Sequence, residues 1–248
     1  MTIHAYTDPK SGRRVRDVFD DAPPPLAIAS DLVPPVPRST SLWILFASGC
    51  GWSDCGAGQR PPQLAKALAA RGYDVFYYSN MDAYAKRSDG VHILCRDEWP
   101  GWLDQAQRHP GIAIVALATY FPTVVPLVDA GWRLVYDLID DWQAFVDCGE
   151  LPGYVLGHEP ELLARAELVT CSAPALMERA HALGATRTAL IPNGGPRSFL
   201  SVPEKPPADM GTDGIRAVYV CCMIGKWFDW EPIKELAAAL KFSLVEEA

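Results

Sequence analysis

The sequence has little that would cross-link the chain or hold a metal. Its 248 residues include seven cysteines and five histidines, and no two cysteines form a Cys-x-x-Cys pair. Cys221 and Cys222 lie side by side in an apolar run. This pattern predicts buried thiols in a reducing compartment, not a disulfide framework or a zinc site. The histidines are scattered, and we expect them at the surface or at helix ends: His4, His92, His109, His158 and His181.

The sequence also lacks an excess of basic charge. Its formal net charge is −8 and its pI is about 5.1. Binding to nucleic acid of any sequence needs a basic face that neutralises phosphates, so we expect no nucleic-acid partner. The only local basic cluster is Arg13, Arg14 and Arg16, which a solvated tail explains better than a membrane or nucleic-acid contact.

No uninterrupted apolar run of membrane-spanning length is present. Residues 111–128 come nearest, but Pro122 and Pro126 interrupt them, which favours a buried strand followed by a helix that starts with proline. The N-terminal residues show no signal-peptide pattern, so the expected location is cytoplasmic. Peripheral attachment to the inner face of the membrane stays open as an alternative.

From Ser41 onward, short apolar runs alternate with amphipathic helical patterns. We expect strands at residues 42–48, 74–79, 91–95, 112–118, 133–139, 167–172 and 188–192. Helices are expected at residues 60–71, 102–108, 122–130, 159–165 and 173–183. Apolar strands that alternate with helices are typical of a parallel sheet covered on both faces. The predicted fold class is therefore α/β, a doubly wound, Rossmann-like parallel sheet.

The composition divides the chain into four parts. Residues 1–40 are rich in proline and predict an extended tail, and residues 41–198 form the expected α/β domain. Residues 199–213 have a linker composition. Residues 214–248 then begin a second α/β domain, with a strand at 215–223, a helix near 230–240 and a strand start at 242–245. This last part is shorter than the roughly 50 residues that such a domain usually needs.

A glycine-rich loop follows the first predicted strand, at the edge where doubly wound sheets bind ligands. Gly49, Gly51, Gly56 and Gly58 allow its backbone close to a ligand, and a helix near Arg60 offers a positive dipole end. A flexible connection is the alternative interpretation. Asp54 stands where a dinucleotide site needs its third glycine, and no Gly-Lys-Ser/Thr motif is present, so an NAD-dependent oxidoreductase and a P-loop are disfavoured.

Four segments in sequence carry a resemblance to a known family. They are QRPPQLAKALAARGYDVFYYSN, RLVYDLIDDWQAF, AELVTCSAPALMERAHALGATRTALIPNGG and VYVCCMIGKWFDWEPIKELA. Their order resembles that of retaining glycosyltransferases of the GT-B fold, family 4-like, of the teichuronic-acid and cell-surface polysaccharide type. The resemblance covers residues 41–240.

This resemblance implies a division of labour between two lobes. The N-terminal half would bind a saccharide or lipid-linked acceptor, and the C-terminal half a nucleoside-diphosphate-sugar donor, with no further cofactor. The glycine-rich loop would form a wall of the cleft, and Lys226 would meet the donor diphosphate unless it is a solvated turn residue. The substrate-binding residues implied are Gly49, Gly51, Gly56, Gly58, Gln59, Arg60, Asn193, Gly194 and Lys226.

Three carboxylates lie at the end of the predicted strand at 133–139 and directly after it. Asp137, Asp140 and Asp141 repel one another unless each finds a donor or solvent. Either Asp140 or Asp141 caps the next helix, or these groups bind sugar hydroxyls and orient the acceptor, as the resemblance suggests. They are the candidate catalytic residues. We expect no metal, because no histidine lies nearby in the sequence.

One family feature is missing. The family's pair of glutamates eight positions apart, which holds the donor, has no match after Gly214, and we interpret the spacing of Glu159 and Glu167 as coincidence. We therefore expect weak or absent sugar transfer by this chain. The alternative function is a non-catalytic saccharide-binding or partner-docking module, completed by a separately encoded donor half.

Overall fold

The structure is a computed structural model that describes residues 42–52, 59–79, 82, 86–194 and 230–240. The described residues belong to one unit, Thr40–Ala248. Several predictions fall outside them: the tail at 1–40, the linker at 199–213 and the strands at 215–223 and 242–245. The helix predicted near residues 230–240 is present as α8 (Trp230–Leu240).

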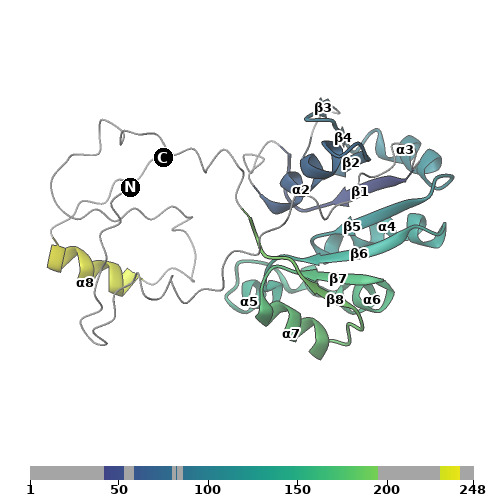
Figure 1. Cartoon of the computed structure of the whole chain (residues 1–248). Helices are drawn as coiled ribbons and strands as arrows, with labels where there is room; N and C mark the ends of the chain where they lie inside the picture. Colours follow the sequence, from purple (N-terminus) through teal and green to yellow (C-terminus); the bar gives the residue numbers. More distant parts are fainter. Residues whose placement is uncertain (1–41, 53–58, 80–81, 83–85, 195–229, 241–248) are drawn as a thin grey trace, which may run out of the picture. The chain divides into compact units, whose positions relative to one another are not determined.

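Eight strands form one sheet (Figure 1). They are β1 (Trp43–Ala47), β2 (Asp74–Tyr78), β3 (Lys86–Ser88), β4 (Val91–Leu94), β5 (Gly111–Val115), β6 (Arg133–Leu138), β7 (Leu168–Cys171) and β8 (Thr188–Leu190). Their order in space is β3-β4-β2-β1-β5-β6-β7-β8. All neighbouring strands pair in parallel except β3 and β4, which are antiparallel.

The strand order shows where the chain reverses its direction across the sheet. From β1 the chain moves outward through β2 to β4, and it then returns to the other side of β1 to place β5. It continues outward through β6, β7 and β8. This is a doubly wound, Rossmann-like α/β fold, and the predicted fold class is confirmed.

Helices connect the parallel strands. They are α2 (Arg60–Ala69), α3 (Trp99–Ala106), α4 (Phe121–Asp129), α5 (Trp142–Asp147), α6 (Glu159–Arg165) and α7 (Pro174–Ala182). Short 3-10 helices lie at η2 (Ala118–Tyr120) and η3 (Gly153–Leu156). Pro61 lies in the first turn of α2 as predicted, where the lost amide hydrogen costs little.

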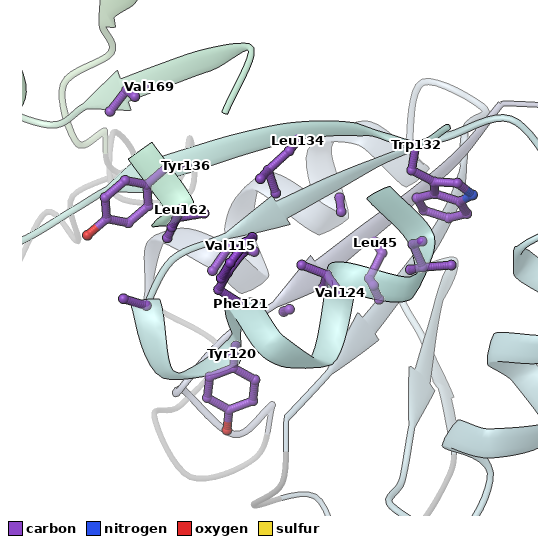
Figure 2. Packing of buried hydrophobic residues seen from close by; sticks show 14 of the residues in the cluster. Leu45, Val115, Tyr120, Phe121, Val124, Trp132, Leu134, Tyr136, Leu162 and Val169 are labelled. Atoms are coloured by element: carbon purple, nitrogen blue, oxygen red, sulfur yellow. The ribbon is translucent and has the colours of Figure 1, made fainter. Parts of the chain in front are cut away.

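The two faces of the sheet are covered by different helices. Alternate residues of a strand point to opposite faces, so Ile44 and Phe46 pack under α2 with Ala65. Leu45 and Ala47 belong to the larger cluster on the other face, where α3, α4, α6 and α7 pack. Figure 2 shows part of this larger cluster, with side chains of α4 lying against β1 and β5.

The structure differs from the sequence predictions at several elements, among them helix α5, which is not among the predicted helices. Strand β3 was not predicted, and it is a short antiparallel strand that pairs with β4. Helix α3 begins at Trp99, before the predicted residue 102, because Pro100 is compatible with its first turn. The predicted helix at 173–183 begins at Pro174 as α7, and the hydroxyl of Ser172 before it donates to the carbonyl of Ile139 at 2.7 Å.

Glycines with a positive φ follow the ends of three helices. Gly72 after α2 has φ +89° and Gly184 after α7 has φ +96°, a conformation that L side chains rarely adopt. Gly131 after α4 has φ +98°. These residues turn the chain toward the next strand.

The apolar segment at 111–128 folds as β5 and α4, not as one helix. Among the described residues, no helix is long and apolar enough to cross a membrane. Among the described cysteines, Cys95, Cys148 and Cys171 are free thiols, and Cys95 and Cys171 are buried. His109, His158 and His181 are exposed, as expected, whereas His92 is half-buried within β4, where its ring packs near Phe76.

Candidate functional site

A groove of about 530 Å³ lies beside α2 at the carboxyl ends of the strands. One helical face of α2 forms its first wall, because positions 60, 63, 64 and 67 are spaced by three or four residues. The residues that follow β6 and β8 form the opposite wall. We call this the α2 groove, and it is lined by Gln59, Arg60, Gln63, Leu64, Ala67, Ile139, Asp140, Ile191, Pro192, Asn193 and Gly194.

The start of α2 presents few free amide groups to this groove. Pro61 and Pro62 have no amide hydrogen, and the amide of Gln63 donates to the carbonyl of Gln59 at 3.2 Å. Only the amide of Arg60 is left in the first turn. Because anion binding at a helix start depends on several free amides, this end of α2 is a weak site for a phosphate.

Arg60 is held by a buried carboxylate. Its Nε lies 2.9 Å from Oδ2 of Asp137 and its Nη2 lies 3.0 Å from Oδ1, and the two side chains are only 8% and 2% exposed. The hydroxyl of Thr170 donates to Oδ1 of Asp137 at 2.6 Å. Asp137 therefore has three neighbouring donors, and its charge balances that of Arg60 inside the protein.

The remaining nitrogen of Arg60 reaches the chain after β8. Its Nη1 donates to the carbonyl of Ile191 at 2.6 Å and to Oδ1 of Asn193 at 3.3 Å. Arg60 thus connects the start of α2 with the ends of β6 and β8. Arg60, Asp137 and Asn193, all candidates from the sequence, are brought together in the fold.

Asp141 has a local role at the start of α5. Its Oδ1 accepts a hydrogen bond from the amide of Ala144 at 3.2 Å, which is the geometry of a helix cap. Nε of Arg179 lies 3.6 Å from the same oxygen. The prediction that one of these carboxylates caps the next helix is confirmed for Asp141.

Asp140 occupies a different environment. It lines the α2 groove and its residue is exposed overall, yet partial burial of the carboxyl raises its pKa above the ordinary value. Gln63 and Asn193 line the same groove. The three carboxylates thereby have separate environments: Asp137, near the end of β6, is the buried partner of Arg60, and Asp140 and Asp141, after β6, are a groove residue and a helix cap.

A further network lies behind β6 and was not predicted from the sequence. Glu159 is buried, accepts the phenol hydrogen of Tyr136 at 2.8 Å, and receives two hydrogen bonds from Arg179 at 3.0 and 2.8 Å. Burial, followed by the charge of Glu159, raises the pKa of Tyr136 well above its usual value. Glu167 instead forms a surface pair with Arg133 at 2.8 Å. The two glutamates therefore share no site, as the sequence interpretation held.

The described part of the glycine-rich loop forms hydrogen bonds with β2 and with Asp82, which lies beyond the end of β2. The phenol of Tyr77 donates to the carbonyl of Cys50 at 2.7 Å, and the buried carboxylate of Asp82 accepts the amide of Trp52 at 3.1 Å. Gly49 lies against Leu117, and neither Gly49 nor Gly51 lines the α2 groove. Gly56, Gly58 and Lys226 lie outside the described residues, so their predicted roles stay predictions.

Within the described ranges, no cluster of three or more histidine, cysteine, aspartate or glutamate side chains has the geometry to hold a metal ion. The groups that line the α2 groove are amides, backbone carbonyls, one carboxylate, the guanidinium of Arg60, whose charge is balanced by Asp137, and apolar side chains. Such a set of donors and acceptors is suited to hydrogen bonding with an uncharged, hydroxylated ligand.

Comparisons with known proteins place few constraints on this chain. No family model matches it, and no curated protein matches it. Among solved structures, it is similar to sucrose-phosphate synthase from Thermosynechococcus elongatus, with a TM-score of 0.46 and 15% identity. The match covers 65% of this chain and 53% of that protein, so the chain spans about half the length of the structure it matches.

Proposed function

We propose that this chain supplies the acceptor side of a glycosyl-transfer site, and that the α2 groove binds the hydroxyl groups of a saccharide or lipid-linked acceptor. The donor in this proposal is a nucleoside-diphosphate sugar. The observation that carries it is the position of Asp140: of the three carboxylates at the end of β6 and just after it, Asp140 is the one that lines the groove and is neither paired with Arg60 nor used as a helix cap.

The proposed chemistry assigns one step to Asp140. The acceptor hydroxyl donates a hydrogen bond to this carboxylate. The oxygen of the acceptor hydroxyl then bonds to the anomeric carbon of the donor sugar. The bond from that carbon to the diphosphate oxygen breaks, and the hydroxyl proton passes to Asp140. A carboxyl pKa raised by burial makes this group a better proton acceptor near neutral pH.

The amide side chains around Asp140 have a supporting role in this proposal. Gln59, Gln63 and Asn193 each offer both a donor and an acceptor, which matches the hydroxyl groups of a sugar. Arg60 acts on the groove as a positioning residue, because it holds the carbonyl of Ile191 and the side chain of Asn193.

A second candidate function is a saccharide-binding module that performs no transfer by itself and is completed by a separate donor half. The charge balance favours it, because Asp137 neutralises Arg60 and the two prolines remove amides from the start of α2. Within the described residues, the α2 groove therefore offers no unpaired cation to a diphosphate.

The experiment compares Asp140→Asn with Asp147→Asn, a matched change at an exposed position of α5. Release of nucleoside diphosphate from UDP-glucose, UDP-N-acetylglucosamine and GDP-mannose is measured with and without methyl glycosides as acceptors. For a transferase we expect slow, acceptor-dependent release that Asp140→Asn lowers at least about 100-fold, the usual range for loss of general acid–base catalysis. Asp147→Asn should leave the rate unchanged.

Binding of the methyl glycosides separates the two candidate functions. Saccharide binding that Asp140→Asn weakens, without turnover of any donor, supports the binding module. Equal turnover by the Asp140→Asn and Asp147→Asn variants contradicts the role of Asp140. Absence of both binding and turnover in the unmodified chain contradicts both functions.

A further inference from the structure

A second groove lies on the opposite face of the sheet, between α3 and the strands β2, β4 and β3. Its volume is about 630 Å³, within the range of small-molecule sites. Three strands separate β4 from β6, so this groove is distinct from the α2 groove. We call it the α3 groove, and it is lined by Phe76, Arg87, His92, Ile93, Leu94, Asp97, Glu98, Gly101, Trp102 and Gln105.

The strand wall of the α3 groove is a row of side chains from three strands. Phe76 of β2 is in register with His92 of β4, and His92 is in register with Arg87 of β3. Residues in register across strands point to the same face of the sheet. The rings of Phe76 and His92 lie 5.3 Å apart. An apolar ring, an imidazole and a guanidinium therefore follow one another along this wall.

The helix wall is a single face at the start of α3. Glu98, Gly101, Trp102 and Gln105 are spaced by three and four residues, so they lie on one side of the helix. The ring of Trp102 lies 5.0 Å from that of Phe76, which joins the helix wall to the strand wall. The groove thus has an aromatic floor between polar rims.

Gly101 keeps this groove open. Apart from proline, glycine is the least favourable residue in a helix, and the backbone of Gly101 does not have the positive φ that would require glycine. A Cβ built at this position meets nothing within 4 Å. Neither packing nor backbone geometry explains glycine here, whereas a side chain at this position would extend into the groove.

Trp102 adds a second, independent observation. Its indole nitrogen is buried and has no hydrogen-bond partner within the part of the chain that the structure describes. A buried donor without an acceptor lowers stability. Trp102 therefore forms part of the groove lining at some cost to the stability of the fold.

The charges at the rim narrow the class of ligand. Arg87 is positive and Asp97 and Glu98 are negative, and burial, followed by the charge of Arg87, lowers the pKa of His92, which favours its neutral form. A phosphate would meet two carboxylates, and a cation would meet Arg87. The hydroxyl groups of a sugar both donate and accept, so they can pair with all these groups, and the apolar face of a sugar ring can pack on an aromatic floor.

We propose that the α3 groove binds an uncharged saccharide unit at a site separate from the α2 groove. The orphaned indole of Trp102, the unexplained glycine at position 101 and the mixed-sign rim together carry this proposal. It does not rest on the proposed transfer function, since it uses a different face of the sheet and different residues.

The test measures binding of maltose and cellobiose to the full chain by calorimetry and by the indole NMR signal of Trp102, which Trp102→Phe identifies. The key variant is Gly101→Leu, which fills the groove with a good helix former. We expect at least tenfold weaker disaccharide binding, no shift of the Trp102 signal, and a melting temperature equal to or above that of the unmodified chain. Asp104→Leu, an exposed position on α3 that does not line the groove, is the matched control and should retain binding.

Each outcome decides the proposal. Loss of the Trp102 shift in Gly101→Leu but not in Asp104→Leu, with both variants folded, supports the α3 groove. If Gly101→Leu is unfolded, Gly101→Gln provides a polar filler with the same expected loss of binding. Binding that survives in the filled and folded variant overturns the proposal, and so does a Trp102 signal that moves with inorganic phosphate but with neither disaccharide.

Discussion

At the scale of single residues, the buried pair of Arg60 and Asp137 leads to a stability prediction. Asp137→Ala leaves the guanidinium in a site where the two side chains were 8% and 2% exposed. Removing one partner of a buried ion pair typically costs about 3–5 kcal/mol. We therefore expect the free energy of unfolding, measured with urea, to fall by about that amount.

A double variant identifies the cause of this loss. Arg60→Met with Asp137→Leu replaces the pair by apolar groups of similar size, and it should recover most of the stability. Asp147→Ala, at an exposed position, should change the free energy of unfolding by less than about 0.5 kcal/mol. If Asp137→Ala behaves like Asp147→Ala, the buried pair does not stabilise the domain.

The buried phenol of Tyr136 leads to a prediction for the unfolding free energy at alkaline pH. Burial, together with Glu159, raises its pKa well above the ordinary value of 10.0, so the folded protein favours the neutral phenol. This contribution to stability is fully present below pH 10, and it is lost as the pH rises further, because the phenol of the unfolded chain ionises first. Above pH 10, the unfolding free energy of Tyr136→Phe should fall less steeply with pH than that of the unmodified chain. Urea titrations at a series of pH values measure this slope.

The control for this prediction is Tyr154, which is 74% exposed. Tyr154→Phe should leave the alkaline slope of the unfolding free energy unchanged. An identical slope for the unmodified chain and Tyr136→Phe would show that the phenol is not held neutral by the fold.

At the scale of elements, two glycines restrict the chain for different reasons. A Cβ at Gly111, the first residue of β5, would lie 2.5 Å from the ring of the buried Trp132. At Gly72, after α2, a Cβ meets nothing within 4 Å, but φ is +89°. Gly111→Ala should cost about 1–3 kcal/mol through overpacking, and Gly72→Ala about 1 kcal/mol through backbone strain.

Replacing Trp132 by a smaller side chain distinguishes overpacking from backbone strain. Trp132→Leu added to Gly111→Ala removes the steric conflict, so the two changes should show a favourable coupling in a double-mutant cycle of unfolding free energies. Trp132→Leu added to Gly72→Ala should be additive. Additivity in both cycles would contradict close packing of Trp132 on β5.

Most of the parallel strands were predictable because they are apolar runs. Each of these strands consists of an apolar run, because both faces of the strand are buried. They are β1, β2, β4, β5, β6 and β7. Strand β3 consists of Lys86, Arg87 and Ser88 and has no apolar pattern, so only its pairing with β4 reveals it.

The candidate site was predictable in its location but not in the role of each residue. The carboxylates at the end of β6 were visible in the sequence because three acidic residues lie close together where one predicted strand ends. Their separation into different roles depends on Arg60, Thr170 and Arg179, which are distant in sequence. No local pattern records such contacts, and the α3 groove was missed for the same reason, since its walls come from four separate elements.

At the scale of the whole molecule, we expect the part of the chain that contains the sheet to fold by itself. The eight strands and helices α2 to α7 all lie between residues 43 and 190, and they bury two hydrophobic clusters among themselves. A fragment of residues 41–198 should therefore unfold cooperatively, with a urea midpoint close to that of the full chain. An aggregated fragment, or one without a cooperative transition, would contradict the proposed domain boundaries.

The account depends most on the claim that the α2 groove binds the sugar acceptor. The most direct measurement is an NMR titration of the labelled chain with methyl glycosides of glucose, mannose and galactose. We predict that at least one of them shifts the side-chain amides of Gln63 and Asn193 and the backbone amide of Asp140, and that uridine diphosphate alone does not. Shifts with uridine diphosphate only, or no shift at these residues with any glycoside, would contradict the claim.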